Sequence, residues 1–235
     1  MSDKHMSTQF DAELSGISTR VLEMGGIVES QVARAVYALT HFSSEIASEV
    51  LATEERVNAT EVAIDHDLST IIARRQPTAR DLRLLIAISK TIANLERVGD
   101  EAARIARTVQ RLVNSGVSSR LRLPVNDLAY ESELAVSQLR KALDAFARLD
   151  VDRAVEVLKQ DDLIDQEFEG LIRKLITFMM EDPRTISSSI DLVFVGKAIE
   201  RVGDHAKNIA EQIIYIVKGT DVRHNSVVTV ETLVR

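Results

Sequence analysis

One duplicated phrase constrains the fold of this chain more than any other feature. Leu95–Asp100 reads L-E-R-V-G-D, and Ile199–Asp204 reads I-E-R-V-G-D, 104 residues later. A second correspondence, at an offset of 107 residues, pairs Ser30–Val32 with Ser137–Leu139. Because the same motifs recur in the same order, the sequence predicts two similar structural units within one chain.

The first unit shows the apolar periodicity of three long helices. Residues 10–42 place apolar side chains every three or four positions, as on one face of a helix. These side chains are Leu14, Ile17, Val21, Met24, Val28, Val32, Val36 and Leu39. The pattern continues over residues 44–75 and stops before Pro77. A third helix is expected to start after Thr78, which can cap it, and to run to about Val113.

The second unit repeats this plan. Asp182-Pro183 predicts an N-cap followed by a proline in the first helical position. The last helix of the unit should then run from about Arg184 to Lys218, where Gly219 closes it.

The expected fold is therefore all-α, with two tandem three-helix bundles related by internal duplication. The first bundle should span residues 10–116 and the second residues 121–219. Residues 220–235 show no helical period and are expected to form a mobile or loosely docked tail.

The composition excludes several classes of protein. The formal net charge of -7 disfavours a general nucleic-acid binder, and the absence of cysteine excludes disulfides and thiolate metal sites. No apolar run reaches the roughly 18 residues of a membrane span. Residues 1–11 are polar and lack the apolar core of a signal peptide. We therefore expect a cytoplasmic protein that is not inserted in a membrane.

Each copy of the phrase places two carboxylates four residues apart: Glu96 with Asp100, and Glu200 with Asp204. In a helix these side chains lie one above the other and repel each other, unless they share a cation. Oxygen ligands favour Mg²⁺, Ca²⁺, Mn²⁺ or iron over zinc. The alternative is that arginines such as Arg97 neutralise the acids as ordinary helix-surface ion pairs.

Further ligands would have to come from neighbouring helices. Glu61 and Asp165 are the weaker candidates on the second helix of each unit, and Asn208 extends the second acidic stripe by one turn. His205 is a further candidate beside Asp204. The other polar side chains available there are Glu54, Glu55, Asn58, Asp65, Asp161, Asp162 and Glu169.

The sequence offers no positive case for catalysis. It has no E-x-x-H, no H-E-x-x-H and no phosphate-binding glycine loop. Gly99 and Gly203 stand on the apolar faces of the third and sixth helices, and small residues there predict a close approach of these helices to each other or to their neighbours.

These residues resemble the PhoU family of bacterial phosphate-signalling regulators. The resemblance covers about residues 10–219. It rests on the two E-R-V-G-D phrases, on Ala73–Pro77 with Asp81–Arg83, and on Asp204–Glu211. It implies two three-helix bundles in a cytoplasmic, often dimeric protein without enzymatic activity. It also implies repression of the phosphate-starvation response through contact with a sensor histidine kinase and with the ATPase subunit of a phosphate importer.

The family motif E/D-x-x-x-D is associated with multinuclear metal binding in some members and with none in others. Here it matches Glu96 with Asp100 and Glu200 with Asp204. The expected cofactors are divalent or trivalent ions (Fe, Mn, Mg or Ca), or none. A metal-dependent helical-bundle enzyme or metal store is the alternative function, and a plain structural bundle with solvated acids is a third.

Overall fold

The structure is a computed structural model that describes residues 2–116 and 124–234. Within these ranges the chain is helical and contains no strand. The long helices are α1 (Ser2–His41), α2 (Ser44–Arg75), α3 (Ala79–Asn114), α4 (Val125–Arg148), α5 (Val151–Glu181) and α6 (Ile186–Lys218). A 3-10 turn, η2 (Pro183–Thr185), precedes α6, and a short helix, α7 (Val227–Val234), ends the described chain.

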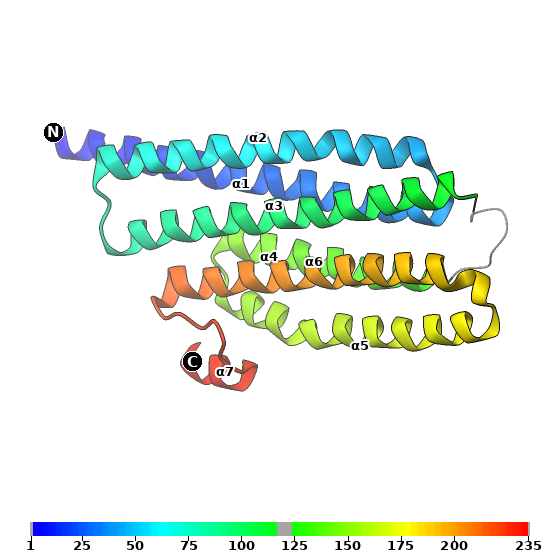
Figure 1. Cartoon of the computed structure of the whole chain (residues 1–235). Helices are drawn as coiled ribbons and strands as arrows, with labels where there is room; N and C mark the ends of the chain where they lie inside the picture. Colours follow the sequence, from blue (N-terminus) through cyan, green and yellow to red (C-terminus); the bar gives the residue numbers. More distant parts are fainter. Residues whose placement is uncertain (1, 117–123, 235) are drawn as a thin grey trace.

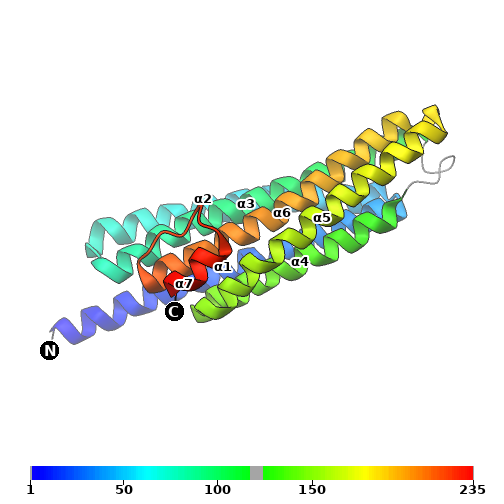
Figure 2. The same ribbon diagram turned by 90° about the horizontal axis from the view of Figure 1, so that it is seen from below.

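The predicted all-α fold with a duplicated plan is confirmed. Helices α1–α3 form one bundle and α4–α6 a second, and the two bundles lie side by side, with α1–α3 extending beyond the second bundle at one end (Figure 1; Figure 2). The contacts between them run from α3 to α6 and from α1 to α4. Arg140 on α4, for example, donates through Nε to Glu29 on α1 at 3.0 Å. The predicted division between residues 116 and 121 reaches into residues 117–123, outside the described residues, and stays a prediction.

Local chemistry explains most helix ends. Ser43 Oγ accepts the Ile46 N–H at 3.3 Å where α2 begins. Helix α2 ends at Arg75, and the next residue, Gln76, caps it in a left-handed conformation directly before Pro77. Asp182 Oδ1 accepts the Arg184 N–H at 3.0 Å, as expected for an N-cap residue that is followed by a proline in the first helical position. The cap starts η2, so that α6 begins at Ile186, two residues later than predicted.

Two further helix ends were predicted from single residues. Gly219 closes α6 with a φ of 72°, which confirms its role as the terminating residue. Thr78 occupies the N-cap position of α3, but its side chain makes no capping hydrogen bond.

The expectation of a tail without helical structure is wrong. Residues 227–234 form α7, and Val222 and Val230 are each only 1% exposed. Lys159 on α5 pairs with Glu231, which fixes α7 beside α5 (Figure 2). The segment V-V-T-V-E-T-L-V is rich in β-branched residues of low helix propensity, so packing rather than local preference stabilises this helix.

Helices α3 and α6 pack against each other, as the small residues predicted. The glycines themselves face their own units. A Cβ added at Gly99 would lie 3.1 Å from Glu54 Oε2 on α2, and one at Gly203 would lie 2.8 Å from Ile164 Cδ1 on α5. The absence of a side chain at each glycine therefore allows the second helix of its unit to pack closely against the third. No helix in the described ranges has the length and apolarity that crossing a membrane requires.

Candidate functional site

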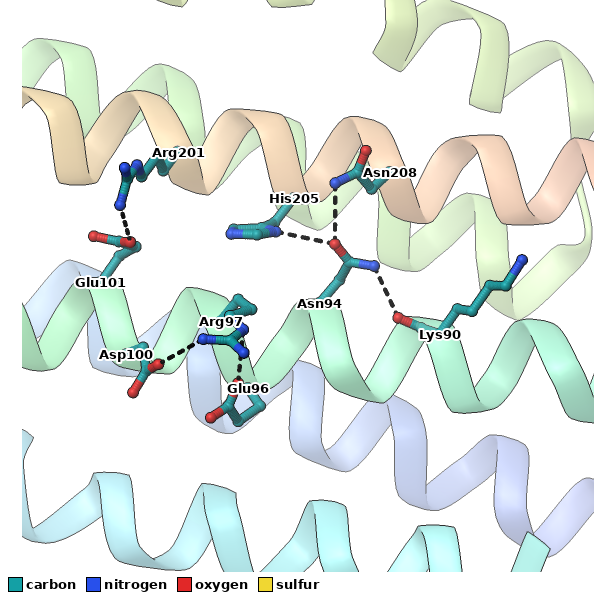
Figure 3. Close-up of polar contacts among 9 residues, drawn as sticks. All are labelled: Lys90, Asn94, Glu96, Arg97, Asp100, Glu101, Arg201, His205 and Asn208. Atoms are coloured by element: carbon teal, nitrogen blue, oxygen red, sulfur yellow. Dashed lines mark hydrogen bonds and ion pairs between the residues drawn. The ribbon is translucent and has the colours of Figure 1, made fainter. Parts of the chain in front are cut away.

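The first acid cluster lies where α2 faces α3. Glu96 and Asp100 project from one face of α3, and Arg97 lies between them (Figure 3). Its guanidinium is 3.5 Å from an oxygen of each carboxylate, and its side chain is 65% exposed. The arginine expected under the ion-pair alternative is thus present, but exposed pairs at this distance contribute little stability.

Helix α2 adds two more carboxyl groups to this cluster. Glu54 is buried and accepts a hydrogen bond of 2.9 Å from Gln31 Nε2. Burial raises the pKa of Glu54, and the charges of Asp100 and Glu96 raise it further. Burial also raises the pKa of Glu61, and the charge of Glu96 raises it further. The predicted candidate Glu61 is therefore brought together with Glu96, and so is Glu54.

The second cluster has the same plan on α5 and α6. Burial raises the pKa of Asp204 to about 6, and the charges of Glu200 and Asp161 add to this effect. Burial raises the pKa of Asp165 as well, again with Asp161 beside it. The predicted candidates Glu200, Asp204 and Asp165 are thus gathered at one place, with Asp161 as a fourth acid.

The two clusters differ in their cations. Lys197 Nζ lies 2.6 Å from Glu200 Oε1, and Lys207 pairs with the buried Asp161. At the corresponding positions, 104 residues earlier, the first unit has Ala93 and Ala103. Lysine charge therefore neutralises part of the second cluster, whereas the first has no lysine there.

The fit of a metal ion to these clusters can be judged from their oxygens. As the side chains stand, no three His, Asp or Glu groups of the described residues converge as a metal-ligand set. Glu54 Oε1 and Glu200 Oε2 are nevertheless buried without a hydrogen-bond partner, one in each cluster. Buried carboxylate oxygens need a proton, a donor or a cation. The first cluster, which has no lysine, fits a cation better than the second.

Sequence reasoning missed Glu131 on α4. Its side chain is 1% exposed, and neither carboxylate oxygen has a hydrogen-bond partner. Burial raises the pKa of Glu131 to about 8, and the charges of Glu200 and Glu167 contribute. The repeat could have indicated that Glu131 is buried, because the corresponding position 107 residues earlier holds Met24, a core residue.

A polar network crosses the seam between α3 and α6 (Figure 3). Asn94 Oδ1 lies 3.0 Å from His205 Nδ1 and accepts from Asn208 Nδ2 at 3.1 Å. Because the amide oxygen only accepts, His205 carries its hydrogen on Nδ1. Burial lowers the pKa of His205 to about 4, and the charges of Arg97 and Arg201 lower it further. His205 is thus neutral, and Asn208 bonds across the seam.

A cavity of about 800 Å³ opens along the same seam. Much of its lining consists of residues that correspond to each other in the repeat. The corresponding pairs are Arg97 with Arg201, Asp100 with Asp204, Glu101 with His205, and Arg104 with Asn208. The loop before α7 closes one side with Arg223, His224, Asn225 and Ser226.

Fold and site together define a class of protein: two similar three-helix bundles among the described residues, with one acid cluster in each bundle and a polar cavity between them. The family model for the PhoU domain matches residues 21–109 and 130–213, once in each half. The chain belongs to the PhoU family.

Relatives and solved structures agree over nearly the whole chain. A phosphate-specific transport system accessory protein PhoU homolog of Burkholderia sp is 48% identical over 96% of this chain and 96% of its own length. PhoU of Escherichia coli (strain K12) is 47% identical, covering 94% of this chain and 90% of its own. The crystal structure of PhoU from Pseudomonas aeruginosa has a TM-score of 0.83 at 44% identity, covering 90% of this chain and 100% of that one.

A more distant structure shows the same fold. The phosphate transport system regulatory protein PhoU from Streptococcus pneumoniae also has a TM-score of 0.83, at 28% identity over 91% of this chain and 99% of its own. These relatives carry the names of accessory and regulatory proteins rather than of enzymes.

Proposed function

We propose that this protein is a negative regulator of phosphate uptake and of the phosphate-starvation response. It acts in the cytoplasm, as a homodimer, between a phosphate importer and a sensor histidine kinase. The observation that carries this proposal is the identity of 47–48% with phosphate-specific transport system accessory proteins over almost the whole chain. Contact with the importer's ATPase subunit and with the kinase follows from the family resemblance.

The shape of the molecule supports an adaptor. Two long bundles side by side present a broad helical surface (Figure 2). One end of the second bundle exposes several large apolar side chains, which are typical of protein contact surfaces. They are Ile176, Met180, Ile186, Ile190 and Phe194, of which Met180 is 80% and Phe194 56% exposed.

A binding experiment tests the adaptor role. The full-length protein, immobilised, is presented with the purified ATPase subunit and with the cytoplasmic part of the sensor kinase. Saturable capture of both partners is expected. Replacing Phe194 by Glu should weaken capture of at least one of them. The matched control is Val62→Glu, a change at an apolar residue of α2 that is 68% exposed. Capture of neither partner by the unaltered protein would reject the adaptor role.

We also propose that the acid clusters hold hard metal ions. Glu96 and Asp100, with Glu54 and Glu61, would bind the ion of the first unit. Glu200 and Asp204, with Asp165, would bind that of the second. The bound ion would neutralise carboxylates that now repel each other. The buried, unpartnered oxygens of Glu54 and Glu200 support this proposal.

Elemental analysis of protein purified without chelator tests the metal proposal. The double variant Glu96→Gln/Asp100→Asn should lose the metal of the first unit, because amides lack the charge that binds a hard cation. The matched control is Glu55→Gln on α2, an exposed acid outside the cluster. Equal metal content in all three proteins would contradict the assignment without affecting the adaptor role.

A further inference from the structure

The repeated phrase directs its glutamates and its arginines to different places. Ion pairs join Arg201 to Glu101 and Arg111 to Asp191, so residue numbers fall along α6 as they rise along α3. The two helices are thus antiparallel, and corresponding residues lie on opposite sides of a pseudo-twofold axis through the seam. Glu96 and Glu200 do not line the central cavity. Arg97 and Arg201 line it, together with Asp100 and Asp204.

The residues that line this cavity include five cationic side chains and four carboxylates. Two of the cations, Lys207 and Arg223, pair with acids that are not in the lining, and the other three are Arg97, Arg104 and Arg201. Glu101 is 5% exposed, and it alone serves two guanidiniums: Arg201 at 3.2 Å and Arg104 at 3.5 Å. Arg97, whose side chain is 65% exposed, pairs with Glu96 and Asp100 at 3.5 Å each. Of the other acids in the lining, Asp100 and Asp204 are neighbours of the outer clusters, and Glu211 lies one helical turn beyond Lys207.

We propose that the central cavity binds phosphate, either as the inorganic ion or as the phosphoryl group of a nucleotide, through Arg97, Arg104 and Arg201. Guanidinium groups match phosphate oxygens in charge and in paired hydrogen-bond geometry. Glu101 holds two of these groups in place before the ligand arrives, which lowers the entropy lost on binding. The volume of about 800 Å³ admits a nucleotide as well as a hydrated phosphate ion.

The site joins the two units, because Arg97 and Arg104 come from α3 and Arg201 from α6. A ligand bound there would pull the two bundles together at their seam, and phosphate status could then alter the surface that partners contact. The inference deepens the proposed regulatory role, and it rests on that role for its biological meaning, although ligand binding can be measured without any partner.

Equilibrium dialysis of the full-length protein against radiolabelled phosphate, in parallel with labelled ADP, tests the proposal. A chelator is present throughout, so that no metal ion can carry the phosphate. Saturable binding of either phosphate or ADP is expected, and which of the two binds shows whether the ligand is the inorganic ion or a nucleotide. The double variant Arg97→Gln/Arg201→Gln should bind at least about tenfold more weakly, because charge-assisted hydrogen bonds are lost.

Arg107→Gln is the matched control. Arg107 lies on α3 within one turn of Arg104, is exposed and does not line the cavity, so its replacement should leave binding unchanged. Thermal melting shows whether each variant is folded. Arg104→Gln provides a second test if the double variant does not fold. Absence of saturable binding to the unaltered protein, or equal binding by folded cavity variants, would overturn the proposal.

Failure of this inference is distinguishable from failure of the adaptor role. Partner capture is measured both in phosphate-free buffer and at saturating phosphate, so that a docking surface that depends on the ligand is not mistaken for a missing one. Capture without ligand binding would reject the cavity site alone, and ligand binding without capture would reject the adaptor role alone.

Discussion

Replacing Glu131 by Met should stabilise the protein, and increasingly so as the pH rises. Glu131 is a carboxyl group in the core of the second bundle, at the place where the first bundle has Met24. Neither of its oxygens has a hydrogen-bond partner. Methionine fills a similar volume without a charge, so the variant removes the cost of burying a carboxylate and keeps the packing.

The magnitude follows from the pKa of this carboxyl group, which burial raises from 4.5 to about 8. A raised carboxyl pKa means that the folded state holds the proton more tightly than the unfolded state. The stability that this proton contributes is complete below the unfolded pKa, and it is lost as the pH rises through the folded one. Each unit of pH between these two pKa values lowers the free energy of unfolding by about 1.4 kcal/mol. At neutral pH, Glu131 therefore lowers it by about 3 kcal/mol.

Urea unfolding followed by far-ultraviolet circular dichroism, in buffer with chelator, measures the effect at about pH 5 and about pH 8. The free-energy difference between Glu131→Met and the unaltered protein should be small in acid and should grow by about 3–4 kcal/mol at the higher pH. Glu133→Gln, an exposed site on the same helix, should show no such growth.

Two results would refute this reasoning. A difference that does not change with pH would mean that Glu131 is not an isolated buried acid. A variant less stable than the unaltered protein at about pH 8 would mean that the carboxylate has a stabilising partner in the folded protein.

Three further predictions concern packing and charge. Gly203→Ala should destabilise by about 1 kcal/mol in urea unfolding, because its Cβ would meet Ile164 Cδ1 at 2.8 Å and the buried Gln138 Oε1 at 3.0 Å. Gly170→Ala, with nothing within 4 Å, should stabilise by up to about 1 kcal/mol. Equal effects at both sites would contradict the close packing around Gly203. Val230→Asp should release α7 and accelerate tryptic cleavage at Arg223 in a time course, since the change puts a charge at a site now 1% exposed, while Val228→Asp, at a site 72% exposed, should not. Lys207→Met should lower the melting temperature in chelator, since it leaves the buried Asp161 unpaired, and added Mn²⁺ should restore stability if the second cluster binds metal; no restoration would argue against a metal site there.

The helices and most of their ends could be predicted from the sequence, because their causes are local. Apolar side chains at helical spacing determine which face each helix buries, and Ser43, Asp182 and Gly219 act on backbone groups within a few residues of themselves. The pairing of Glu96 with Asp100 and of Glu200 with Asp204 also follows from spacing alone. The duplication can be recognised in the sequence because both units place similar residues at corresponding positions of the same three-helix packing arrangement.

Other features depend on which helices meet, and only the tertiary structure decided them. Because α3 and α6 pack antiparallel, Arg97 and Arg201 line one cavity, although 104 residues separate them in the sequence. Helix α7 forms because α5 supplies a surface for Val230, against the preference of its own valines. Glu131 is buried because α4 keeps the position of a core methionine, and the cost of its charge arises only when α5 and α6 exclude water from it. Apolar periodicity indicates which face of a helix is buried, whereas the exposure and the charge environment of a polar side chain depend on the residues of the helices packed against it.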